Sequence, residues 1–149
     1  MDPLDSRLTL GRFLAQVAAL HGSHPAIRFE GRTTSYAELE RESRQLARAL
    51  IGAGVVKGAR VAVHMSNRPD WIVSCFAVGM VGGVLVPVNT FATRNELQYI
   101  LRHSDASVLL MQPKLLEHHY LDDLLTDHPS IARGTPVCGC RSRCAGRPR

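Results

Sequence analysis

The sequence lacks any long apolar run, and before residue 133 it has a single cysteine, Cys75. The longest apolar stretch, residues 71–88, is interrupted by a serine, three glycines and a proline, so it falls short of the roughly 18 residues of a membrane-spanning helix. Acidic residues stand at the start, where a secretory signal peptide would be positively charged. These absences predict a cytoplasmic protein without a membrane span, in which Cys75 is a buried, inert thiol.

Charge is distributed unevenly along the chain. All 13 acidic residues and 13 of the 18 lysines and arginines lie before residue 133, so that part is formally neutral. The remaining five arginines lie in residues 133–149, which carry the entire net charge of +5. The basic overall character therefore does not indicate a nucleic-acid-binding or lipid-binding domain, because only the C-terminal segment is basic.

Helical and strand patterns alternate along the chain, which is typical of an α/β fold. Apolar residues at helical spacing predict helices over residues 9–21, 36–50, 69–81, 94–103 and 113–126. Short apolar or β-branched runs predict a hairpin over residues 26–34 and buried strands over 60–64, 84–88 and 107–111. Right-handed crossovers between such strands imply a mostly parallel sheet with flanking helices.

Local signals indicate where several helices begin. Residues 35–38 and 93–96 each have the pattern of a capping box, in which a hydroxyl and a carboxylate bind each other's backbone amides. Pro69 is suited to the first position of a helix. The helix that follows is apolar on almost all sides, so it must be covered on most of them, or its surface would favour docking or poor solubility.

Two short strings resemble motifs of one enzyme superfamily. Residues 34–39 read TSYAEL, and residues 79–89 read GMVGGVLVPVN, in which an apolar helix end leads into a strand and Val-Pro-Val-Asn. The segments 54–63, 67–71 and 89–101 also fit in order and spacing, with Ala59 where an Asp is usual. Over roughly residues 8–128 the sequence resembles the adenylate-forming (AMP-binding) enzymes, which include acyl-CoA synthetases, peptide-synthetase adenylation domains and beetle luciferases.

The resemblance implies that residues 8–128 are a partial N-terminal domain of an ATP-dependent acyl-CoA ligase of the fatty-acid type. In such enzymes a carboxylate attacks the α-phosphate of ATP, with Mg²⁺ present, and CoA then displaces AMP. The family's Ser/Thr/Gly-rich phosphate loop with its lysine is not in this sequence, whose only lysines are Lys57 in an expected turn and Lys114 at an expected helix start. We therefore assign no catalytic, cofactor-binding or metal-binding residue, and we expect this chain alone to bind no cofactor.

Two other patterns have simple structural interpretations. The glycines of residues 52–58 superficially resemble a dinucleotide fingerprint, but they follow a helix and precede a strand, the reverse of the order that phosphate binding needs. We interpret them as a helix-to-strand turn. His118 and His119 are adjacent, so on a helix only one could face a given metal; beside Asp122 and Asp123 they indicate a solvated face.

Residues 133–149 have no hydrophobic periodicity, and we expect them to be a disordered tail. Cys138, Cys140 and Cys144 could bind zinc together with His128, but their spacing misses the usual Cys-x₂₋₄-Cys pairing and no packed scaffold is expected around them. The segment is rich in Arg, Gly, Ala, Pro and Cys, so we also hypothesise that it results from a frameshift within residues 130–134. Reading the gene in the other two frames tests this.

Three functional hypotheses follow. The leading one is a truncated relative of a fatty-acid-type acyl-CoA ligase, which is inactive alone because it lacks the residues that position and stabilise adenylyl transfer. The second is a non-catalytic module that docks on a full-length homologue through exposed apolar surface. The third, and least favoured, is a nucleic-acid binder that uses the five tail arginines.

Overall fold

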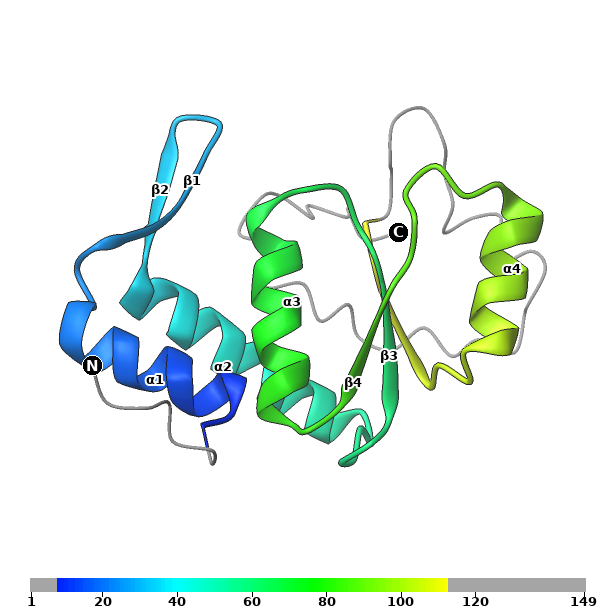
Figure 1. Cartoon of the computed structure of the whole chain (residues 1–149), viewed down its shortest axis with the longest axis horizontal. Coiled ribbons are helices and arrows are strands. Elements are labelled where there is room, and N and C mark those ends of the chain that lie inside the picture. The colour runs from blue at the N-terminus through cyan, green and yellow to red at the C-terminus, as the bar shows by residue number, and fades with distance from the viewer. Residues whose placement is uncertain (1–7, 113–149) are drawn as a thin grey trace, which may run out of the picture.

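The computed structural model describes residues 8–112, which form an α/β fold (Figure 1). Its helices are α1 (Leu10–His21), α2 (Tyr36–Gly52), α3 (Pro69–Met80) and α4 (Arg94–His103). Its strands are β1 (Pro25–Phe29), β2 (Arg32–Ser35), β3 (Arg60–His64), β4 (Val84–Pro87) and β5 (Val108–Met111). Each element predicted within this range is present, with bounds that differ by at most a few residues.

The strands form two separate sheets. β1 and β2 pair as an antiparallel hairpin, while β3 pairs in parallel with β4 on one side and with β5 on the other. The strand order of the parallel sheet is therefore β4-β3-β5. Helices α3 and α4, which follow β3 and β4, lie on opposite sides of this sheet (Figure 1). Right-handed crossovers require this placement, because the connection from β3 to β4 and the connection from β4 to β5 run in opposite directions across the sheet.

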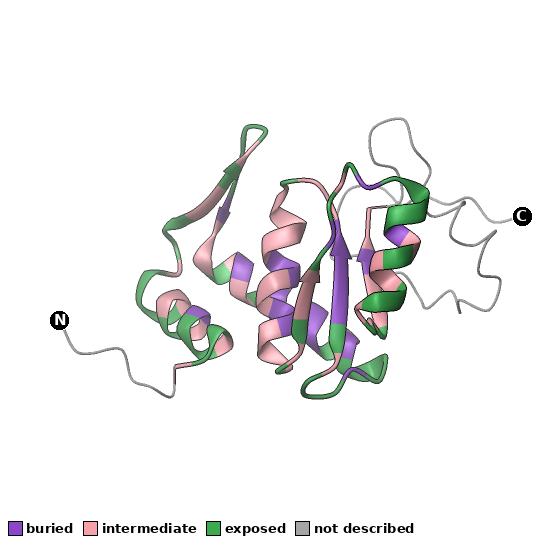
Figure 2. Ribbon diagram, turned by 45° about the vertical axis from the view of Figure 1, so that its right-hand side comes forward, coloured by how far each residue is buried: buried purple, intermediate pink, exposed green. Residues whose placement is uncertain are grey.

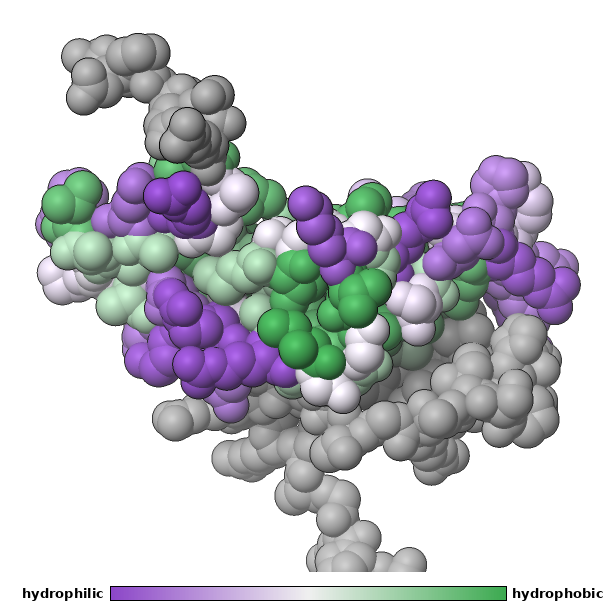
Figure 3. Space-filling view, turned by 90° about the horizontal axis from the view of Figure 1, so that it is seen from below, coloured by the Kyte–Doolittle hydropathy of each residue, from purple (hydrophilic) through white to green (hydrophobic). Residues whose placement is uncertain are grey.

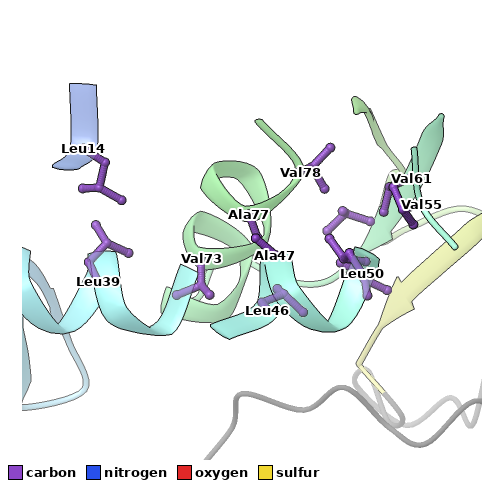
Figure 4. Packing of buried hydrophobic residues seen from close by; sticks show 12 residues of the cluster. Leu14, Leu39, Leu46, Ala47, Leu50, Val55, Val61, Val73, Ala77 and Val78 are labelled. Atoms are coloured by element: carbon purple, nitrogen blue, oxygen red, sulfur yellow. The ribbon is translucent and has the colours of Figure 1, made fainter. Parts of the chain in front are cut away.

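The larger core lies on the α3 side of the sheet, where helices α1, α2 and α3 meet it. Twelve buried apolar residues gather there, including Leu50 at 1% exposure and Val61 at 0%. In Figure 4 the labelled side chains of α2, such as Leu46 and Ala47, and those of α3, such as Ala77, lie where the two helices meet. The members come from three helices, two strands and the turn at Val55, and this cluster is the main source of hydrophobic stabilisation in the described chain.

The α4 side of the sheet has a much smaller core. Its buried members are Ala62, Val88 and Leu97, surrounded by apolar residues that are only partly buried. Figure 2 shows α4 with mostly exposed and intermediate residues, while the central strand is almost entirely buried. Within residues 8–112, α4 is thus a thin cover for this face.

The expected helix and turn signals are confirmed. Ser35 and Glu38 at α2, and Thr93 and Glu96 at α4, form complete capping boxes. The N–H of Ser35 donates to Glu38 Oε2 at 2.9 Å. In the hairpin turn, Glu30 and Gly31 both have positive φ, of 47° and 76°. A two-residue turn with this backbone geometry matches the right-handed twist of the two strands that it joins.

Helix α3 is covered as its apolar sequence requires, because α1, α2 and the sheet pack against it and none of its residues is exposed. One expectation about this helix differs from what the structure shows. Cys75 is only partly buried, not fully buried as predicted, although desolvation still raises the pKa of its thiol. The predicted helix over residues 113–126, the domain limit at 128 and the tail lie outside the described residues.

Candidate functional site

The carboxyl ends of β3, β4 and β5 lie at one edge of the sheet, where ligands of open α/β sheets usually bind. The chain runs from β3 to β4 and then back past β3 to β5, so the strand order reverses between β3 and β5. Polar residues follow all three strands at this edge: Ser66 and Asn67, Asn89, and Gln112. This carboxyl edge is therefore the candidate site that the topology defines.

The polar groups after β3 and β5 bind each other. Ser66 Oγ donates to Gln112 Oε1 at 3.1 Å, and the N–H of Gln112 donates to the carbonyl oxygen of His64 at 3.1 Å. These bonds extend the β3–β5 pairing beyond the strands themselves. The side chains at the reversal point thus hold the edge of the sheet together, and neither is a nucleophile paired with a general base.

Asn89, which the resemblance places in the Val-Pro-Val-Asn string, shapes the connection from β4 to α4. Its Oδ1 accepts the N–H of Phe91 at 3.0 Å, and its carbonyl oxygen accepts the N–H of Ala92 at 3.1 Å. An Asx turn of this kind reverses the chain directly before the Thr93 cap. The described contacts give Asn89 a structural role.

His64 is the last residue of β3 and is fully buried, with 0% exposure. Burial lowers its pKa below the ordinary 6.5, because the charged imidazolium is poorly solvated there, while the backbone of Asn89 acts in the opposite direction. The lowering dominates, so His64 is neutral at pH 7. Sequence analysis did not single out this histidine, although its position in an apolar strand predicts that it is buried.

An open pocket of about 380 Å³ lies between the hairpin and the start of α3. Apolar side chains from both elements line it, and the polar lining comes from Arg28, Asn67 and Arg68. Arg68 Nε lies 2.5 Å from Asp70 Oδ2, so this arginine already has a carboxylate partner. The pocket brings together no nucleophile and base, and it offers an apolar surface more than a reactive one.

The other candidate residues from the sequence that lie within residues 8–112 belong to a structural turn. Gly54 and Gly58 have positive φ, of 87° and 83°, in the turn between α2 and β3, which confirms the interpretation of the glycine pattern as a turn. Lys57 lies in the same turn, where its side chain is next to Gly82, at the amino ends of the strands. His118, His119 and the cysteines with His128 lie outside residues 8–112.

Among residues 8–112, no group of three His, Cys, Asp or Glu side chains could hold a metal ion. Within the same range, none of the helices has the length and apolar character needed to cross a membrane. The candidate sites within the described residues are therefore the carboxyl edge and the pocket between the hairpin and the start of α3.

The three parallel strands with alternating helices, preceded by a hairpin and two packed helices, define an α/β scaffold of the adenylate-forming class. Comparison with known families agrees, since residues 14–139 match the model of the AMP-binding enzymes. The chain belongs to this AMP-binding enzyme family. The matched range continues past residue 133, where the charge distribution changes.

Individual relatives are acyl ligases. The chain is 32% identical over 120 residues to the acyl-CoA ligase sidI of Aspergillus fumigatus, covering 79% of this chain and 20% of that protein. It is 37% identical over 103 residues to the fatty acid–[acyl-carrier-protein] ligase ScoC of Streptomyces coeruleorubidus, covering 66% and 20%. The chain thus spans about a fifth of the length of these two relatives.

A solved structure gives the same result for the fold. O-succinylbenzoate coenzyme A synthetase (MenE) of Bacillus subtilis, in complex with ATP and magnesium, superposes with a TM-score of 0.64 at 29% identity. The match covers 67% of this chain and 27% of MenE. The α/β scaffold of the described residues is therefore shared with part of an ATP-dependent CoA ligase.

Proposed function

We propose that this chain forms the opening scaffold of an ATP-dependent acyl-CoA ligase of the fatty-acid type, and that it has no adenylating activity alone. The observation that carries this proposal is the carboxyl edge, where Ser66 and Gln112 bind each other and Asn89 binds its own turn. These groups are engaged in holding the sheet together. Family membership supports the reaction class, and the name of ScoC supports a fatty-acid type of substrate.

Adenylation needs groups that grip a triphosphate and stabilise charge as the α-phosphate is attacked. In the family that work needs a flexible Ser/Thr/Gly-rich loop with a lysine, and the sequence has neither such a loop nor a lysine other than Lys57 and Lys114. Lys57 lies at the amino ends of the strands, opposite the carboxyl edge. ATP, Mg²⁺ and CoA would accordingly be used by the complete ligase architecture, and we place that activity in the cytoplasm.

ATP–pyrophosphate exchange with labelled pyrophosphate tests this proposal. The purified 149-residue chain is assayed with a panel of fatty acids, alongside full-length sidI or ScoC as a positive control for the reagents. We expect exchange at the level of a blank without protein. Saturable exchange that depends on both ATP and an acid would overturn the proposal.

A second candidate function is docking on a full-length homologue. At the amino ends of the strands, Ile51, Val56 and Val84 are 60%, 68% and 48% exposed, and the bond from Gly58 N–H to the Gly82 carbonyl joins the two turns concerned. Seen from this end, Figure 3 shows hydrophobic side chains gathered near the middle of the face. Such a patch on a small chain favours burial against a partner.

Co-purification with a tagged full-length ligase tests the docking candidate, with Val56→Ser and Val84→Ser as variants at the patch. Retention that both variants reduce would support docking, and equal retention of all variants would contradict it. A salt-titrated binding assay with a DNA or RNA oligonucleotide, with and without residues 133–149, tests the nucleic-acid alternative. We expect no binding that depends on those residues at physiological salt.

A further inference from the structure

The hairpin of β1 and β2 has a free edge on the β1 side. Within residues 8–112, β1 pairs only with β2, in an antiparallel register that sets Arg28 opposite Thr33 and Phe29 opposite Arg32. The edge of β1 that faces away from β2 therefore has no strand beside it in the described chain. Figure 1 shows the hairpin projecting beyond helices α1 and α2. Such an edge presents backbone groups to which another extended chain can bind.

The register of the hairpin directs the backbone groups of Arg28 outward. Antiparallel ladders alternate between residue pairs that exchange two hydrogen bonds and pairs whose N–H and C=O groups point away from each other. The two-residue turn after Phe29 makes Phe29 and Arg32 a bonded pair, so the next pair, Arg28 and Thr33, is of the second kind. Elsewhere in the described chain, no backbone group bonds to the backbone of Arg28. One residue of an added strand can therefore exchange two hydrogen bonds with Arg28.

The pocket of about 380 Å³ lies along this edge of β1. Its lining includes residues 27–29 of β1 and no residue of β2, and the opposite wall comes from the start of α3 and the residues just before it. On that wall Pro69, Trp71 and Ile72 are only partly buried, so they present apolar surface to the space beside β1. A strand added at this edge would lie against that wall. Peptide-binding domains of the strand-addition type combine backbone pairing with side-chain pockets in this way.

The charges at the pocket favour an acidic partner. Arg68, which also lines the pocket, lies 2.5 Å from Asp70, so its charge is balanced within the chain. Arg28 is exposed, and among the described residues no carboxylate lies within ion-pair distance of it. Pairing of two copies of this chain through β1 would bring their Arg28 side chains close together, and like charges across a strand pair are destabilising. A different chain that carries a carboxylate is therefore favoured over a second copy.

We propose that the β1 edge and its pocket bind an extended peptide segment of a partner protein, in which an acidic residue stands between two apolar residues. The segment adds to the hairpin as a third strand. Its acidic residue lies opposite Arg28, exchanges two backbone hydrogen bonds with it and binds its guanidinium. The two flanking apolar side chains point to the other face of the added strand, which is the face of Ile27 and Phe29. This inference does not rest on the proposed function, because strand addition needs neither ATP nor a fatty acid.

Trp71 is the only tryptophan of the chain, so its fluorescence reports on the pocket directly. The complete 149-residue chain is titrated with the capped peptide Thr-Leu-Glu-Leu-Thr. We expect a saturable change in fluorescence and slower hydrogen exchange of the Arg28 amide. The same peptide methylated at the glutamate nitrogen cannot donate to the Arg28 carbonyl oxygen, so it should produce neither change. Equal responses to the two peptides, or no saturable response to the first, would overturn the proposal.

A charge exchange at Arg28 tests the acidic character of the partner. Arg28→Glu should weaken binding of the glutamate peptide about tenfold and strengthen binding of the same peptide with lysine in place of glutamate, because it reverses the charge opposite that residue. Arg48→Glu is the matched control, since Arg48 is exposed on α2 outside the pocket and the two variants have the same net charge. Equal effects of the two variants would contradict the proposal, as would a peptide-free chain that is dimeric through β1.

Discussion

The two faces of the parallel sheet differ in how much each holds the molecule together. Within residues 8–112, the α3 face is covered by three helices and contains twelve buried apolar residues, whereas the α4 face is covered by one helix and contains three. The first face is built from segments that precede β4 almost entirely, so residues 10–81 make their own core. The second is built mainly from residues 86–111. The early part of the described sequence thus supplies the larger core, and the later part supplies the smaller one.

The largest expected effect is the loss of a large side chain from the well-covered face. Leu50 is 1% exposed and packs in the larger core, so Leu50→Ala should lower the free energy of unfolding by about 4 kcal/mol, near the upper end for such changes. Chemical denaturation measures it. Leu97→Ala is the matched change on the α4 face, and we expect about 2 kcal/mol because its looser surroundings can relax into the cavity. Equal costs at the two sites would remove the contrast between the faces.

The capping boxes give a second, smaller comparison. Ser35→Ala and Thr93→Ala each remove a hydroxyl that accepts a helix amide, which costs about 1 kcal/mol. The consequences should differ in extent. Loss of the Ser35 cap should lower global stability, whereas loss of the Thr93 cap should increase hydrogen exchange in α4 alone. Global destabilisation by Thr93→Ala, similar to that of Ser35→Ala, would indicate that α4 is as tightly coupled to the core as α2.

On the α3 side of the sheet, substitution of Ser43 should increase the stability of the chain, whereas the substitutions above decrease it. Its side chain is 0% exposed, and within residues 8–112 its hydroxyl has no hydrogen-bond partner. Ser43→Ala removes that unsatisfied group without adding volume, so it should raise stability by up to about 1 kcal/mol. Thermal unfolding followed by circular dichroism measures the change. A lower Tm for Ser43→Ala would show that the hydroxyl has an interaction that the described contacts do not include.

The pH dependence of stability tests the α4 face separately. His64 is two residues after Ala62 in β3, so both residues belong to this face of the sheet. Its pKa in the folded chain is below the ordinary 6.5, so the unfolded chain binds more protons as pH falls. Stability should therefore be full above pH 6.5 and decrease below it. Denaturation of the native chain and of His64→Leu between pH 5 and 8 measures this. An equal decrease in the variant would assign the effect to other groups.

The sequence predicted the elements of the described chain well because their signals are local. Capping boxes, the glycine at position 54 and the apolar run of β3 act within a few residues, and each is confirmed. Burial was harder to predict. The helical spacing of α1 predicted an apolar face, yet Leu14 is buried while Phe13 and Leu20 are 44% and 77% exposed, because only one side of α1 meets α2 and α3.

The candidate site was less accessible from sequence than the fold. Ser66 and Gln112 are 46 residues apart, and only the β4-β3-β5 order brings them together. Strand order depends on which faces pair in three dimensions, and alternation of helices and strands does not determine it. The resemblance to the adenylate-forming enzymes, in contrast, rested on contiguous strings and is confirmed by the family match over residues 14–139.

The most direct test of the central claim, a ligase scaffold without nucleotide chemistry of its own, is the conversion of ATP to AMP by the purified 149-residue chain. The reaction is run with Mg²⁺, CoA and a fatty acid, and AMP is measured by chromatography against a full-length relative. The account predicts AMP at the level of the protein-free blank. Saturable AMP formation that requires the acid would contradict it.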